Sequence, residues 1–122
     1  MTRQEDLKGL LEGISQNLDG FIGASVVDIA SGMSLESTTK VPEFDLDIAA
    51  AYNAEMVKAK FKTMKALNIT SELVDMLLTL DDQLHLIRML EDRYFLYAAV
   101  YSSGTNLAML RAVVNAEVKK YA

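Results

Sequence analysis

Apolar residues recur along the chain with two different periods, and the changes of period divide it into helices and strands. The first apolar residues fall three and four positions apart, as on one buried face of a helix, and predict a helix over residues 2–17. Thr2 and Glu5 have the spacing of a capping box for its first turn. Gly9 and Gly13 lie one turn apart on this helix, and we expect them to let it approach a sheet closely.

The stretch from Phe21 to Ser37 has the pattern of a hairpin around which the other elements pack. Both alternating sets of residues 22–27 are small or apolar, which is typical of a central strand covered on both faces. Residues 28–32 suit a turn, because aspartate and serine side chains bond their own backbone and glycine accepts a positive φ. Residues 33–36 then return as a second strand.

A long helix and a three-stranded meander follow the hairpin. The helix covers about residues 45–67, and Asp45 suits its N-cap position. Strand-like segments span residues 72–80, 83–90 and 94–101, and the turns between them are too short for crossovers, so these strands form an antiparallel meander. A final helix over residues 106–121 completes an α+β fold, in which the strands can share one five-stranded antiparallel sheet with helices on its faces.

Two apolar surfaces have no evident cover in this arrangement. The strand over residues 72–80 carries few charges and belongs to a meander, so one of its backbone edges is open to pairing. The long helix carries an apolar arc wider than one sheet contact requires, made of Ile48, Tyr52, Met56, Val57, Phe61 and Met64. Either a loop covers the strand edge or a second copy of the chain pairs with it, and we favour pairing in a two-fold homodimer. The predicted interface residues are Tyr52, Met56, Asp75, Met76 and Leu77.

Charge and composition narrow the possible functions. The net charge of −5 argues against general nucleic-acid binding, and the absence of cysteine excludes disulfides and thiolate metal sites. Lys58, Lys62 and Lys65 nevertheless share one face of the long helix. Cations are favoured at a helix C-terminus, but a basic patch on an acidic protein can also dock an acidic protein surface, a phosphate or anionic lipid.

No residues have the pattern of a nucleophile and its base. His85 is the only histidine and lies in a strand pattern, which favours a structural role, and Asp81–Asp82 has the pattern of a solvated turn rather than a cation site. Tyr94, Tyr97 and Tyr101 split between the sheet faces and either pack in the core or line a ligand pocket. With no P-loop and no dinucleotide fingerprint, we predict no catalytic, cofactor-binding or metal-binding residues and no bound cofactor.

The order of the elements and several short motifs together resemble the roadblock/dynein light-chain family over essentially the whole chain. The motifs are Val26-Val27-Asp28 with Ser31-Gly32, the alanine-rich start of the long helix, the meander, and Gly104-Thr105-Asn106-Leu107 with Leu110-Arg111. The resemblance implies a single domain over residues 1–122, similar to profilin and longin domains, with the middle helix on one face of the sheet and the terminal helices on the other. It also implies a dimer in which the third strand and the middle helix pair with their counterparts.

The resemblance also implies a class of function. Family members are non-enzymatic by themselves and serve as motor-complex adaptors, membrane scaffolds or regulators of Ras-like GTPases, and bacterial members often accompany a small GTPase. We therefore expect a dimeric scaffold and regulator of a Ras-like small GTPase, with the lysine face as its partner-binding surface. Stimulation of GTP hydrolysis, where it occurs, would come from ordering the GTPase's switch loops, because no arginine of this chain lies in a long predicted loop.

Other expectations remain beside this one. A small-molecule sensor with a ligand cavity against the sheet is the alternative function, since sensor domains also cover an antiparallel sheet with helices. An enzyme is disfavoured by the missing catalytic groups. The acidic N-terminus and the lack of an apolar run near 20 residues predict a cytoplasmic protein that reaches membranes at most through partner proteins.

Overall fold

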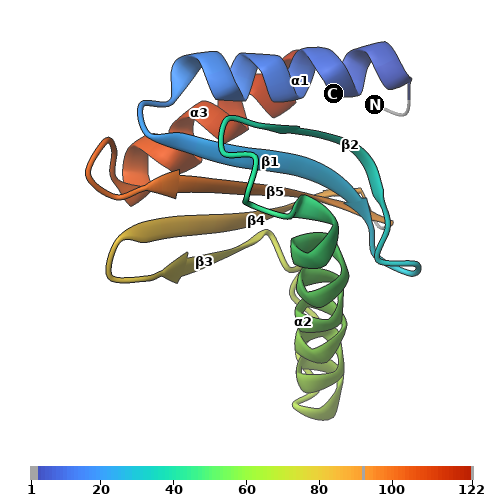
Figure 1. The fold of residues 1–122 in the computed structure, drawn as a ribbon. Helices are drawn as coiled ribbons and strands as arrows, with labels where there is room; N and C mark the ends of the chain where they lie inside the picture. Colours follow the sequence, from blue (N-terminus) through green and yellow to red (C-terminus); the bar gives the residue numbers. More distant parts are fainter. Residues whose placement is uncertain (1–2, 92, 122) are drawn as a thin grey trace.

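The computed structural model describes residues 3–91 and 93–121, which form a five-stranded antiparallel sheet between two helical layers (Figure 1). The elements in chain order are α1 (Gln4–Asn17), β1 (Phe21–Asp28), β2 (Ser34–Thr39), α2 (Leu46–Ala66), β3 (Asp75–Thr79), β4 (Gln83–Glu91), β5 (Tyr94–Tyr101) and α3 (Leu107–Lys120). The strand order is β2-β1-β5-β4-β3, so β2 and β3 are the two edges. The predicted α+β fold is confirmed, with α2 on one face of the sheet and α1 and α3 on the other.

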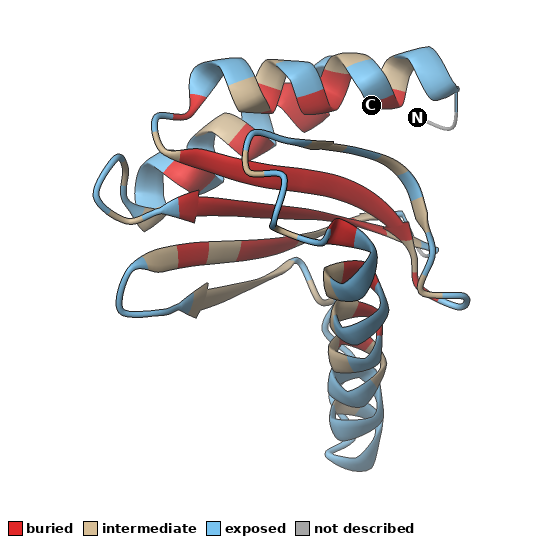
Figure 2. Ribbon diagram, viewed as in Figure 1, coloured by how far each residue is buried: buried red, intermediate tan, exposed pale blue. Residues whose placement is uncertain are grey.

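The sheet separates two hydrophobic cores. Every residue of β1 from Phe21 to Val27 is buried, as expected for a central strand whose alternating residues face different helices (Figure 2). Ala24 and Val26 belong to the core beneath α1 and α3, whereas Ile22 and Val27 belong to the core beneath α2. The hairpin after β1 also forms as predicted, because the Asp28 carboxylate accepts hydrogen bonds from the Ser31 backbone and hydroxyl at 3.0 and 2.7 Å. These two bonds lower the pKa of Asp28.

The glycines of α1 face α3 rather than the sheet, so that expectation was wrong. A β-carbon at Gly9 would meet the Tyr121 hydroxyl, and one at Gly13 would meet the buried Glu117 carboxylate. The two glycines are therefore notches that let large side chains from the end of the chain fit against α1. The proposed cap at Thr2 lies outside the described residues, and α1 begins after Arg3 without a side-chain cap bond.

Small residues carry the packing of α2 on the sheet. Asp45 caps the helix as predicted, accepting hydrogen bonds from the backbone of residues 47 and 48 at 3.0 and 3.1 Å. The buried residues of α2 are Leu46, Ala50, Ala54 and Val57. The helix packs over β1 and β2, and its C-terminal half extends past the sheet, where it is mostly exposed (Figures 1 and 2).

Candidate interaction surface

Strand β3 presents a free edge whose side chains are only partly covered. It pairs with β4 on one side, with Met76 opposite Ile87 and Leu77 opposite Leu86, and no residue of the strand is fully buried. The strand is shorter than the predicted span of 72–80. Regular alternation over the predicted span would place Leu73 and Met76 on opposite faces, but both pack in the α2 core, because the period of two holds only within the regular strand.

Asp75 faces α3 and contributes only its backbone to the free edge. Its carboxylate accepts two hydrogen bonds from the Arg111 guanidinium, at 3.0 and 3.1 Å, and its side chain is 14% exposed. On the adjacent strand, Arg88 donates to the side chain of Asn115 at 2.9 Å. Two arginines thus connect the edge of the sheet to α3. Within the motif that includes Arg111, Asn106 caps α3 by accepting from the backbone of Met109.

The predicted interface residues of α2 differ in exposure. Tyr52 is 73% exposed, and Ile48 beside it is also exposed. Met56 is half-buried and packs against the core beneath α2. The apolar arc predicted for α2 therefore divides, because Val57 lies in the core while Tyr52 and Ile48 lie in solvent. The interface itself stays a prediction.

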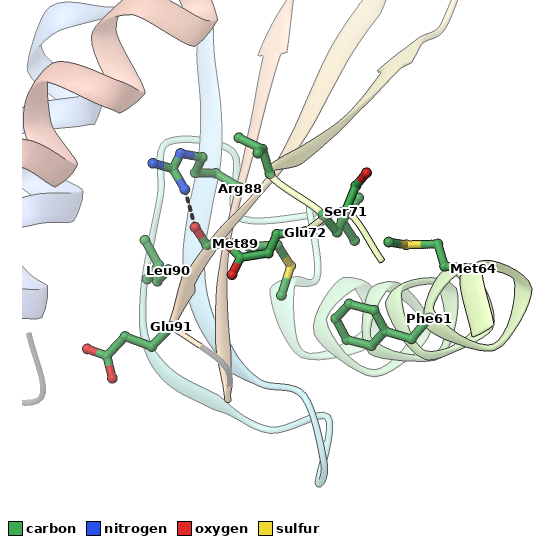
Figure 3. Close-up of a pocket in the computed structure, with 10 residues that line it drawn as sticks. Phe61, Met64, Ser71, Glu72, Arg88, Met89, Leu90 and Glu91 are labelled. Carbon is green, nitrogen blue, oxygen red and sulfur yellow. Dashed lines mark hydrogen bonds between the residues drawn. The ribbon is translucent and has the colours of Figure 1, made fainter. Parts of the chain in front are cut away.

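A cleft of about 470 Å³ separates the C-terminal half of α2 from the segment that leads into β3 and from the last residues of β4 (Figure 3). Its apolar lining consists of Phe61, Met64, Leu73, Val74, Met89 and Leu90. Its polar lining consists of Ser71, Glu72, Arg88 and Glu91. Sequence reasoning missed this cleft, since its floor is an irregular segment whose path no periodicity indicates.

The three lysines of the predicted partner-binding face have different surroundings. Lys58 is half-buried and donates to the Ala30 carbonyl at 3.2 Å and to Glu55 at 3.3 Å, so it ties α2 to the β1–β2 turn. Lys62 and Lys65 are exposed on the part of α2 that extends past the sheet. Lys62 and Lys65 are therefore the accessible members of this face.

His85 is part of a half-buried polar cluster beneath the start of α2. Its Nε2 lies 2.8 Å from the Gln83 side-chain oxygen and its Nδ1 lies 3.1 Å from the Tyr97 hydroxyl. With Nε2 donating to Gln83, Nδ1 accepts from Tyr97, so both ring nitrogens are used. The Phe44 ring lies edge-on to His85 and stacks on Tyr97. Burial lowers the pKa of His85 and raises that of Tyr97 to about 12.

The three tyrosines of β5 lie in different environments. Tyr97 packs in the core beneath α2, Tyr94 packs on the opposite face, and Tyr101 is exposed.

Among the described residues, no three histidine, aspartate or glutamate side chains gather closely enough to hold a metal ion. None of the helices in this part of the chain has both the length and the hydrophobicity of a membrane-crossing segment.

Comparison with known proteins finds solved structures with a similar fold. Neither models of protein families nor curated proteins match the sequence. MglB from Myxococcus xanthus has a TM-score of 0.86 at 13% identity, over 99% of this chain and 88% of that one. A Roadblock/LC7 domain from Streptomyces avermitilis has a TM-score of 0.78 at 15% identity, over 91% and 90% of the two chains. MglC from Myxococcus xanthus has a TM-score of 0.63 at 22% identity, over 94% and 95%. The chain therefore has the roadblock/LC7 fold.

Proposed function

We propose that this chain is a dimeric, non-enzymatic scaffold and regulator of a Ras-like small GTPase. The observation that carries the proposal is the free apolar edge of β3 beside a helix that extends past its own sheet. A surface of this kind fits an interaction module, and the resemblance to roadblock proteins supplies the class of partner.

Self-association is the first part of the proposal. An open edge strand with apolar side chains invites pairing, and a second copy offers an identical edge with matched register. The exposed Tyr52 and the far half of α2 would lie beside the same region of the second copy. The pairing therefore accounts for both apolar surfaces at once.

The contact with the GTPase is the second part. Lys62 and Lys65 project from α2 in a protein whose net charge is −5, so an acidic partner surface would be guided to this helix rather than to the rest of the molecule. Such contacts mainly accelerate association and weaken as salt is added. Lys58 lies at the border of this surface, because its ammonium group already binds the β1–β2 turn.

Association kinetics with purified Ras-like GTPases of the same cell test the proposal. Each GTPase is loaded with GDP or a non-hydrolysable GTP analogue, and the Lys62→Glu/Lys65→Glu variant is compared with the unaltered chain. Lys8→Glu/Lys119→Glu is the matched control, since both of its lysines are exposed on the helices of the other layer. We expect the first variant alone to slow association while the dimer stays intact. Equal rates for the two variants would contradict the lysine contact, and the absence of binding to any GTPase would contradict the function.

The cleft beside α2 favours the sensor as a second candidate. Its volume of about 470 Å³ lies within the range of small-molecule sites, and its lining mixes apolar residues with Arg88 and Glu91. Native mass spectrometry of the purified protein separates the two candidates. A scaffold gives the mass of the bare chain or its dimer, whereas a stoichiometric additional mass would support the sensor.

A further inference from the structure

We infer that the cleft beside the C-terminal half of α2 receives Leu80 from the β3–β4 turn of a second copy of this chain. The inference rests on the proposed homodimer and adds which residue of one copy fills which hollow of the other. The cleft and the turn lie at opposite ends of β3, so Leu80 cannot enter the cleft of its own molecule.

The direction of pairing brings these two features together. Two identical edge strands that pair around a two-fold axis run antiparallel, so the beginning of one β3 lies beside the end of the other. The beginning of β3 at Asp75 follows Leu73 and Val74, which line the cleft, and the end at Thr79 precedes Leu80. When the pairing centres on Leu77, the middle residue of β3, Leu80 of the second copy lies opposite Val74.

The chemistry of the two surfaces matches. Leu80 is 41% exposed although it is a large apolar residue, and the cleft offers it Phe61, Met64 and Val74. Phe61 and Met64 lie on the side of α2 that faces Met89 across the cleft (Figure 3). The C-terminal half of α2, which carries both residues, extends past the edge of its own sheet, beside the place that a second strand would occupy. Burial of Leu80 there removes apolar surface from water on both copies.

Charge favours the same arrangement. Asp81 and Asp82 follow Leu80 in an exposed turn, and α2 carries four lysines and no acid after Glu55. Lys60 lies one helical turn before Met64, so it shares the side of α2 on which this lining residue lies. The opposite rim carries Glu72, Glu91 and Arg88, so the excess of basic charge lies on the helix side of the opening. An acidic turn is therefore drawn toward the lysines on the helix side.

Sedimentation velocity of Leu80→Ala measures the contribution of this contact to the dimer. The matched control is Leu35→Ala, because Leu35 is 39% exposed and belongs to the other edge strand of the sheet. Each dimer contains the contact twice, so we expect Leu80→Ala to raise the dimer dissociation constant about tenfold or more. Leu35→Ala should leave it unchanged. Circular dichroism verifies that both variants fold, which the exposure of the two leucines favours.

A double-mutant cycle identifies the hollow that receives Leu80. Phe61→Ala should also weaken the dimer, and the Phe61→Ala/Leu80→Ala chain should lose less than the product of the two single effects, because each change removes one side of the same contact. Asp82→Lys provides an independent variant that leaves the leucine in place. It should weaken the dimer, and adding Lys60→Glu to the same chain should recover affinity.

The outcomes separate the inference from the function on which it rests. A stable dimer that responds equally to Leu80→Ala and Leu35→Ala would overturn the inference and leave the homodimer standing. Fully multiplicative effects of Phe61→Ala and Leu80→Ala would also overturn it, since the two residues would then act independently. A native chain that remains monomeric at micromolar concentration would overturn the inference together with the proposed self-association.

Discussion

Replacement of Arg111 by Gln should release the edge of the sheet before it unfolds the protein. Arg111 makes two hydrogen bonds to Asp75, whose side chain is 14% exposed, while its own side chain is 48% exposed. Hydrogen bonds to charged groups contribute about 1.5–3 kcal/mol, and solvent around the half-exposed arginine reduces this value, so we expect a loss of about 1–2 kcal/mol. At about 2.1 cal/mol/K of unfolding entropy per residue, each kcal/mol lowers the melting temperature by about 4 °C in a chain of this length. Arg111→Gln should therefore melt about 4–8 °C lower.

Hydrogen exchange followed by mass spectrometry shows where the stability is lost. No residue of β3 is fully buried, so the amides of β3 and of the facing part of β4 should lose protection first. Arg93→Gln is the control, because Arg93 is exposed and lies over the ring of Tyr94 without contacting β3. If Arg111→Gln exchanges and melts like Arg93→Gln, the ion pair does not hold the edge strand and the reasoning fails.

Four further changes test other features of the molecule. Gly104→Ala should destabilise the fold by about 1–3 kcal/mol in calorimetry, because its β-carbon would lie 2.9 Å from the backbone between α1 and β1. Gly9→Ala should melt at the same or a higher temperature, since the Tyr121 ring can turn aside and alanine favours the helix by about 1 kcal/mol; a clear loss would show that the notch is essential. The lowered pKa of His85 means that the unfolded chain binds the proton more readily, so stability in urea should fall as pH drops below about 6.5, and His85→Gln should flatten this dependence. Met76→Lys should weaken the dimer or aggregate the chain in light scattering, and a normal dimer would argue against pairing at β3.

The order of the helices and strands could be predicted from the sequence, because each element is indicated by the spacing of its own apolar residues. The small and apolar residues on both faces of β1 indicated the central strand, and the short turns permitted only a meander. The residues through which α2 packs on the sheet could not be predicted in the same way. The sequence analysis noted the large apolar residues of α2 and assigned Tyr52 to a dimer interface, but it did not identify Ala50 and Ala54, which are buried where the helix lies close to the sheet. Small residues on the sheet side of a helix give little signal in a pattern that is read from large apolar residues.

The candidate site depended on contacts that no local pattern contains. Arg111 and Asp75 lie far apart in the sequence and meet only because α3 crosses the end of β4. The cleft depends on the path of the irregular segment between α2 and β3, where neither a helical nor a strand period applies. The lysine face was visible as a spacing, but the tether from Lys58 to Ala30 required the turn to be placed in space.

The two edges of the sheet are chemically unequal, and this inequality sets how far an assembly can grow. Strand β2 alternates exposed and half-buried residues with a polar sequence, and Gln4 from α1 donates to the backbone carbonyl of Leu35 at 3.0 Å. Two copies joined at β3 would carry β2 at both outer ends of their common sheet. With the proposed pairing at β3, only the polar β2 edges would stay open, so strand addition would end at two copies. Raising the protein concentration would then increase the number of dimers and not their size, and fibres would have no apolar strand edge from which to elongate.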